Sequence, residues 1–125
     1  MTKFQQLGGE PAVRAILRDF VDRIFDDVMI GFFFARASRE RIAEFEYQHA
    51  AAFLGADIVY EGRPLRAAHG SHAIRGGHFE RRKEILRQVL VAHGVPDDIR
   101  AEWIAHTESL RAEITGDPGS ECRDR

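Results

Sequence analysis

Three histidines, His69, His72 and His78, lie within ten residues of one another in the stretch PLRAAHGSHAIRGGHF, residues 64–79. Imidazole is the commonest metal-ligating side chain in proteins and also an ordinary surface group. His78 stands at the expected start of a helix, and His72 lies in an irregular stretch. Both are therefore explained as solvent-facing or capping residues, which leaves His69 as the candidate ligand.

His69 closes a short predicted helix whose inner side is formed by Leu65 and Ala68. Its ring is expected to point toward a cavity. A lone inward-facing histidine is more often a hydrogen-bonded core residue than a metal ligand, and only the surrounding pattern can favour the second role.

Glu46 and His49 form a second pair of chemically active side chains, spaced to lie on one face of another predicted helix. Together with His69 and His72 they could imitate the carboxylate-rich centre of a di-metal helix bundle, which needs such pairs from two helices and further glutamates. A glycine and a serine interrupt the histidine pair, and the pattern places a single carboxylate inward. A di-metal centre is therefore disfavoured.

Composition limits the class of protein. The chain has 125 residues, enough for one domain, and a net charge of −2 argues against a nucleic-acid-binding face. Its apolar runs are shorter than the roughly 20 residues that span a bilayer. The N-terminus lacks the apolar core of a signal peptide, so we expect a cytoplasmic protein. A single cysteine, Cys122, allows neither an internal disulfide nor a cysteine-based zinc site.

Periodicity predicts an all-α domain over residues 1–115, followed by a disordered polar tail at 116–125. Ser38 is a plausible N-cap, and an apolar connector containing three consecutive phenylalanines has no clean period. A lone apolar stretch after residue 56 is read as irregular, because a single strand would have nothing to pair with. The main helices are expected over residues 11–26, 39–54, 78–93 and 97–115. The predicted inward residues of the last three helices are Ile42, Phe45, Glu46, His49, Ala50 and Phe53; Phe79, Leu86, Val89 and Leu90; and Ile99, Trp103, His106, Leu110 and Ile114.

From residue 4 to residue 114 this pattern resembles the truncated hemoglobins, small globins in which a two-over-two helical sandwich encloses heme. The ordered landmarks are LGGEPAVRAILRDFVDRIF, the FFF connector, FLGA, YEGRPLRAAH, AIRGGHF, HGVPDD and LRAEI. The most specific is Y-x-G-x-x-[LM]-x-x-x-H, followed nine residues later by H-F. The resemblance is to the group I subtype.

The resemblance implies that His69 is the proximal ligand of the iron in heme b, as is usual in globins. Phe34 matches the phenylalanine that packs flat on the porphyrin, with Phe20 and Phe33 behind it. His72 matches a position near a propionate. The further expected heme contacts are Val21, Ile42, Phe45, Ala50, Tyr60, Leu65, Ala68, Ile74 and Phe79.

The side of the heme opposite His69 departs from the group I pattern. Val21 stands where a tyrosine is usual, and Glu46 stands where a glutamine is common. Losing a neutral hydrogen bond to a ligand costs on the order of 1 kcal/mol, so we expect weak oxygen retention. Glu46 is expected either to pair with Arg39 or Arg41 at the rim or, protonated by burial, to act as a general acid.

His49 lies one turn beyond Glu46 on the same predicted stripe. Three roles are open to it: a residue at the pocket rim, a partner of Glu46, or a sixth iron ligand. Because direct ligation would need the helix to move, the rim is the favoured position.

The resemblance therefore implies a heme protein that binds oxygen, nitric oxide or carbon monoxide, as a monomer or homodimer with an unidentified reductase. The alternative is a heme enzyme with peroxidase-like, nitric oxide dioxygenase-like or substrate-oxidising activity that uses Glu46 and His49. A globin fold that has lost heme and serves as an interaction module is a third class. His69 and the FFF connector argue against it.

Overall fold

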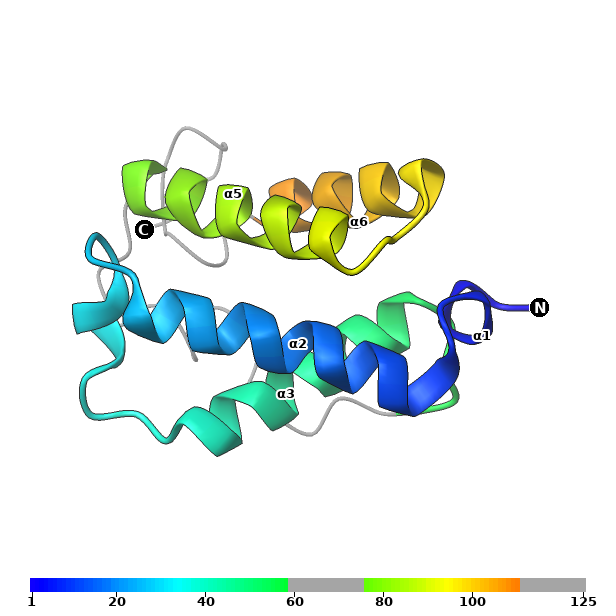
Figure 1. Ribbon diagram of the computed structural model, residues 1–125, viewed down its shortest axis with the longest axis horizontal. Helices are drawn as coiled ribbons and strands as arrows, with labels where there is room; N and C mark the ends of the chain where they lie inside the picture. Colours follow the sequence, from blue (N-terminus) through cyan, green and yellow to red (C-terminus); the bar gives the residue numbers. More distant parts are fainter. Residues whose placement is uncertain (59–75, 111–125) are drawn as a thin grey trace.

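The computed structural model describes residues 1–58 and 76–110, and all structural statements below concern these residues. They form helices without strands, as the sequence predicted (Figure 1). The elements in chain order are α1 (Lys3–Gln6), α2 (Gly9–Asp26), the 3-10 helix η1 (Gly31–Phe34), α3 (Arg39–Phe53), α5 (Gly76–Ala92) and α6 (Asp97–Ser109).

The helices make two layers, with α2 and α3 in one and α5 and α6 in the other (Figure 1). The long helix α2 contacts both α3 and α5, so it forms the centre of the packing. Its apolar side chains recur at helical spacing and are buried on both of its covered sides. They are Val13, Ile16, Leu17, Phe20, Val21 and Ile24.

The ends of α2 follow from local chemistry. Gly8 precedes the helix with φ +112°, a left-handed conformation that glycine adopts without a steric penalty. Pro11 lies in the first turn, where its missing N–H has no intrahelical partner to lose. The helix ends at Asp26 as predicted, and Asp27 is extended.

The connector after α2 is more regular than predicted, because it contains η1. The backbone N–H of Gly31 donates to the carbonyl of Asp27 at 2.8 Å. A Cβ on Gly31 would lie 2.5 Å from the carbonyl oxygen of Phe25, so this close approach requires a glycine. The tight turn brings Phe33 and Phe34 back toward the helical layers.

Ser38 is the N-cap of α3, as predicted, with its hydroxyl accepting a hydrogen bond from the N–H of Arg41 at 3.2 Å. The core covers only part of the stripe predicted for this helix, since Ala50 belongs to the core and Ile42 and Phe53 pack against it. The buried side chains are Ala43, Tyr47, Gln48, Ala50 and Ala51. Of the predicted stripe, Ala50 is buried, and the half-buried members are Ile42, Phe45, Glu46, His49 and Phe53.

The second layer is formed by α5 and α6. On α5 the buried side chains predicted from the sequence are Phe79, Leu86, Val89 and Leu90. Ile99 and Trp103 of α6 are buried as predicted, whereas His106 is half-buried. The last helix ends at Ser109 with Leu110 as its C-cap, so the predicted span to residue 115 was too long; residues 111–115 lie outside the described part.

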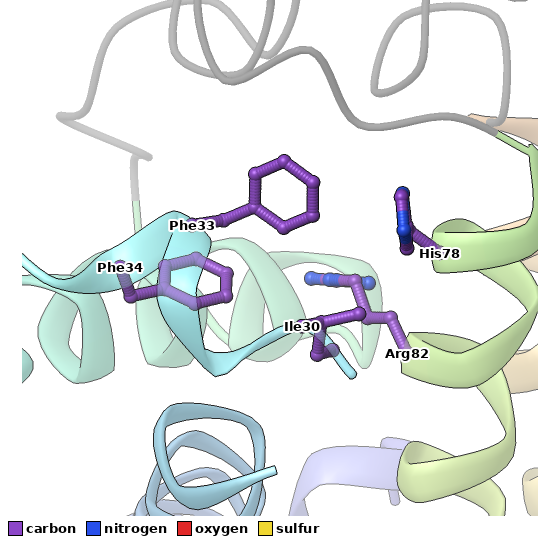
Figure 2. Close-up of a pocket in the computed structure, with 5 residues that line it drawn as sticks. All are labelled: Ile30, Phe33, Phe34, His78 and Arg82. Atoms are coloured by element: carbon purple, nitrogen blue, oxygen red, sulfur yellow. The ribbon is translucent and has the colours of Figure 1, made fainter. Parts of the chain in front are cut away.

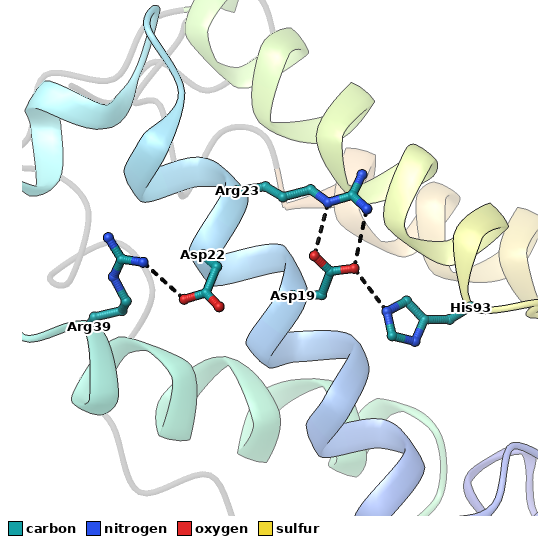
Figure 3. A network of polar contacts seen from close by, with 5 residues as sticks. All are labelled: Asp19, Asp22, Arg23, Arg39 and His93. Atoms are coloured by element: carbon teal, nitrogen blue, oxygen red, sulfur yellow. Dashed lines mark hydrogen bonds and ion pairs between the residues drawn. The ribbon is translucent and has the colours of Figure 1, made fainter.

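Polar contacts at the surface join α2 to its neighbours in both layers (Figure 3). Asp19 on α2 accepts hydrogen bonds from Arg23 on the same helix and lies 2.9 Å from Nε2 of His93, just beyond α5. Arg39 at the start of α3 donates to Asp22 of α2 at 3.0 Å. Within the described ranges, no helix is both long and apolar enough to cross a membrane.

Candidate functional site

The described part of the chain contains ten of the predicted site residues. They come from α2 (Phe20, Val21), η1 (Phe33, Phe34), α3 (Ile42, Phe45, Glu46, His49, Ala50) and α5 (Phe79). The predicted iron ligand His69 lies outside the described residues. So do the other predicted contacts of that segment, which are Tyr60, Leu65, Ala68, His72 and Ile74.

Where η1 meets α5, a mostly apolar cavity is lined by Ile30, Phe33, Phe34, His78 and Arg82 (Figure 2). The space around these side chains amounts to about 190 Å³ when the part open to solvent is included, and the hollow itself has room for about one water molecule. Two of its five lining residues, Phe33 and Phe34, are predicted porphyrin contacts. The cavity therefore forms at the phenylalanine-rich connector that the resemblance assigned to heme.

His78 is not the solvent-facing or capping residue that the sequence suggested. Its ring packs edge-on against Phe33, with 4.9 Å between the ring centroids, and it faces the cavity (Figure 2). The Nδ1 atom of His78 is buried and has no hydrogen-bond partner among the described residues. An unpaired buried polar atom is costly, because such atoms are normally satisfied by the protein or by an ordered water.

Glu46 pairs with a residue that the sequence did not single out. Its Oε2 atom accepts a hydrogen bond from Nη2 of Arg82 at 2.9 Å, and the two side chains are 21% and 10% exposed. The predicted partners are engaged elsewhere. Arg39 pairs with Asp22 and Asp26, and the guanidinium of Arg41 lies over the ring of Phe45.

Arg82 also lies over the ring of Phe20, with 5.0 Å from its guanidinium carbon to the ring centroid. Phe20 is 1% exposed and Val21 is completely buried. The place where a tyrosine hydroxyl was expected therefore holds an aliphatic side chain that can donate nothing. The guanidinium that lies over Phe20 comes instead from α5, in the opposite layer.

His49 lies beside α6. Its ring stacks on His106 with 5.5 Å between centroids, and His106 stacks on Phe53 at 4.1 Å. Burial lowers the pKa of His106, and the charge of a protonated His49 lowers it further. This contact is compatible with a position at the edge of the pocket, and the roles considered for His49 stay predictions.

The described residues fit a flat apolar cofactor. The side chains of Ile42, Phe45 and Phe53 on α3 are half-buried, and Ile42 and Phe53 also pack against the core. Together they form an apolar flank that stays partly exposed. Phenylalanine rings are suitable walls for a porphyrin because they stack without needing hydrogen-bond partners. A heme bound here would need one imidazole from the protein as a ligand of its iron.

Comparison with known proteins decides the family. The family model for bacterial-like globins matches residues 2–116. A group 1 truncated hemoglobin of Synechocystis is 34% identical over 112 residues, which cover 83% of this chain and 87% of that protein. This chain is a group 1 truncated hemoglobin. Another such protein, from Mycolicibacterium paratuberculosis, is 28% identical over 93% of this chain and 86% of its own length.

Solved structures agree with this assignment. The crystal structure of the truncated hemoglobin of Tetrahymena pyriformis in its Fe(III) form superimposes with a TM-score of 0.81 and 25% identity, covering 91% of this chain and 97% of that one. The predicted two-over-two globin fold is therefore confirmed. Membership in the family also implies that this truncated hemoglobin binds heme and that a diatomic ligand binds to it.

Proposed function

We propose that this truncated hemoglobin holds heme b through His69 and binds oxygen, nitric oxide or carbon monoxide on the opposite face, with weak retention of oxygen. The proposal is supported by Phe33 and Phe34, which line the cavity beside η1. Its weak retention of oxygen is supported by Val21, a buried aliphatic side chain next to Phe20. Heme supplies the iron at which the gas binds. The protein supplies the walls, which are Phe33 and Phe34 on η1 and the half-buried flank of α3.

Weak retention follows from the chemistry of Val21. A tyrosine hydroxyl at this position would donate a hydrogen bond worth on the order of 1 kcal/mol to the bound ligand. That energy corresponds to roughly fivefold in a dissociation rate. Valine offers no donor, so oxygen should leave faster than from relatives that carry the tyrosine.

Ligand binding is favoured over the enzymatic alternative by the contact between Glu46 and Arg82. In the structure Oε2 of Glu46 accepts a hydrogen bond from Nη2 of Arg82, so this oxygen already holds the guanidinium in place. We therefore place gas binding ahead of peroxidase-like, dioxygenase-like or substrate-oxidising chemistry by Glu46 and His49. The unidentified reductase, the monomeric or homodimeric state and the cytoplasmic location stay predictions.

Heme ligation is tested by the absorption spectrum of the purified protein. We expect a Soret band that is lost or strongly shifted in His69→Ala, because the axial imidazole is gone, and that returns on addition of free imidazole. His93→Ala is the matched control, because His93 lies at the surface beside Asp19, and this variant should retain the band. A wild-type chain that takes up no added hemin would refute the proposal.

Oxygen retention is tested with two variants at Val21 that differ by one hydroxyl group. Both Val21→Tyr and Val21→Phe enlarge a fully buried side chain, so they share the cost of overpacking, typically about 1–3 kcal/mol. In stopped-flow measurements of oxygen dissociation, the tyrosine variant should release oxygen about fivefold more slowly than the phenylalanine variant. Equal rates would show that the missing hydroxyl does not determine retention.

A further inference from the structure

Arg82 is a buried charged residue on α5, with 8% of its surface exposed. Arginine stays protonated in proteins, so the site holds a permanent positive charge. Burying such a charge is costly unless a partner compensates it, and here the partner is Glu46 at 2.9 Å. A buried ion pair is nevertheless weak evidence for stabilisation, because apolar residues of similar volume often serve as well. Stabilisation alone therefore does not explain why Arg82 and Glu46 are paired here, and we look for a function of the pair.

We propose that Arg82 is the side chain that contacts the ligand in place of the missing tyrosine, and that the pocket consequently favours small anionic ligands on ferric heme. This inference rests on the proposed heme-binding function. It extends that function by naming the recognising residue and the class of ligand. Azide, fluoride and nitrite are representatives of that class.

The position of Arg82 supports this role. Its guanidinium lies over Phe20, the neighbour of Val21, and its side chain lines the cavity together with Phe33 and Phe34 (Figure 2). These phenylalanines are the predicted heme contacts of α2 and η1. Arg82 therefore brings a hydrogen-bond donor from α5 to Phe20, Phe33 and Phe34. A tyrosine at position 21 on α2 would have brought its hydroxyl to the same side chains.

The hydrogen-bonding capacity of Arg82 is sufficient for two tasks. A guanidinium has five N–H donors. Within the described part of the chain, its hydrogen bond to Glu46 uses Nη2, which leaves donors at Nε and Nη1 for a ligand. Hydrogen bonds from a charged donor to an anion are roughly twice as strong as those between neutral groups.

Glu46 acts on the ligand in the opposite sense. Its carboxylate fixes the guanidinium, but its negative charge repels an anion that approaches the same pocket. Removing the charge of Glu46 and removing the charge of Arg82 should therefore change anion affinity in opposite directions. A purely structural ion pair would make no such distinction.

The test is a titration of the heme-loaded ferric protein with azide, followed by absorbance. Arg82→Met should weaken azide binding about tenfold or more, because a charge-assisted hydrogen bond is lost. Glu46→Gln keeps an acceptor for Nη2 but removes the negative charge, so azide should bind several-fold more tightly. Arg87→Met is the control, since Arg87 lies on the exposed side of α5 and pairs with Glu84; it should leave azide affinity unchanged.

A second variant covers the case in which Arg82→Met does not fold because Glu46 is left unpaired. The double variant Glu46→Gln/Arg82→Met removes both charges, and it should bind azide more weakly than Glu46→Gln, which differs from it only in keeping the guanidinium. An independent readout is the C–O stretching frequency of the ferrous carbon monoxide complex. A nearby positive charge lowers this frequency, so Arg82→Met should raise it and Glu46→Gln should lower it.

The outcomes separate the two proposals. A protein that takes up no heme overturns the proposed function. The role of Arg82 is overturned, and heme binding is left intact, if the heme-loaded protein has the same azide affinity and C–O frequency with and without the Arg82 guanidinium. Weaker azide binding in Glu46→Gln would also overturn it, because the two charges would then not oppose each other.

Discussion

Asp27 links the end of α2 to both η1 and α5, and replacing it should loosen the connector that carries Phe33 and Phe34. One carboxylate oxygen, Oδ2, accepts the backbone N–H groups of Met29 at 2.9 Å and Ile30 at 3.2 Å. The other, Oδ1, accepts hydrogen bonds from Arg81 of α5 at 2.9 and 2.6 Å. The side chain of Asp27 is 6% exposed, so water cannot readily replace these partners.

The magnitude follows from these contacts. Loss of a capping carboxylate costs about 1 kcal/mol, and loss of a buried hydrogen bond to a charged group costs about 1.5–3 kcal/mol. Asp27→Ala should therefore lower the free energy of unfolding by about 2–4 kcal/mol, a large part of the roughly 5–15 kcal/mol that stabilises a typical domain. For a chain of this size the melting temperature should fall by on the order of 10 °C.

The effect should depend on pH in a defined direction. Hydrogen bonds from Arg81 lower the pKa of Asp27 despite its burial, and those from Met29 and Ile30 add to the effect. The unfolded chain protonates this carboxyl near pH 3.9. The contribution of Asp27 is therefore fully present above that pH, and it is lost as the pH falls through the lower pKa of the folded state.

The assay is thermal denaturation followed by circular dichroism, with Asp26→Ala as the matched control. Asp26 is the preceding residue, its side chain is 71% exposed and it pairs with Arg39 at 3.1 Å, so its replacement should cost little. Asp27→Asn, which keeps an acceptor but loses the charge, should fall between wild type and Asp27→Ala. If Asp27→Ala melts within a few degrees of Asp26→Ala, the linking role assigned to Asp27 is wrong.

Two further predictions concern stability. Gly31→Ala places a Cβ against the carbonyl oxygen of Phe25 and should destabilise the protein by about 1–3 kcal/mol in urea denaturation. The control is Gly77→Ala, whose added Cβ meets no atom within 4 Å and should cause no loss of stability. Similar unfolding midpoints for the two variants would contradict the close approach of Gly31 to Phe25. Burial, and then the charge of His49, lower the pKa of His106 in the folded protein. As the pH falls, this imidazole is therefore protonated in the unfolded chain before it is protonated in the folded one. The wild-type apoprotein should consequently lose stability as the pH falls below about 6.5. His106→Gln should show a shallower loss between pH 7 and pH 5, and an equal slope would exclude His106 as its source.

The helices were predictable because their signals are local. The hydroxyl of Ser38, the glycine at position 8 and the spacing of apolar residues on α2 act within a few residues along the chain. The 3-10 turn was missed because three consecutive phenylalanines show no period. The end of α6 at Ser109 was missed because an apolar residue at Leu110 continues the pattern without extending the helix.

The partner of Glu46 could not be predicted, because neighbouring basic residues that look alike in the sequence have different surroundings in the folded protein. Arg81, Arg82 and Lys83 are consecutive, and nothing in that run distinguishes the middle residue. In the structure each pairs with a carboxylate far along the chain, on the connector, on α3 and on α6 respectively. The middle side chain is 10% exposed, against 36% for Arg81 and 23% for Lys83. Helical rotation alone turns it inward.

The stripe on α3 shows why a cofactor site is hard to separate from a core by periodicity. Ala43, Tyr47 and Ala51 are buried against the protein, whereas Ile42 and Phe45, equally apolar, stay half-buried on the adjoining flank. A periodic pattern groups residues that avoid water and does not say what covers them. An apolar flank that the helices leave partly uncovered is expected when a heme completes the packing. Heme binding should therefore stabilise this fold, and most of that gain should come from the flank and from Phe33 rather than from the buried face of α3.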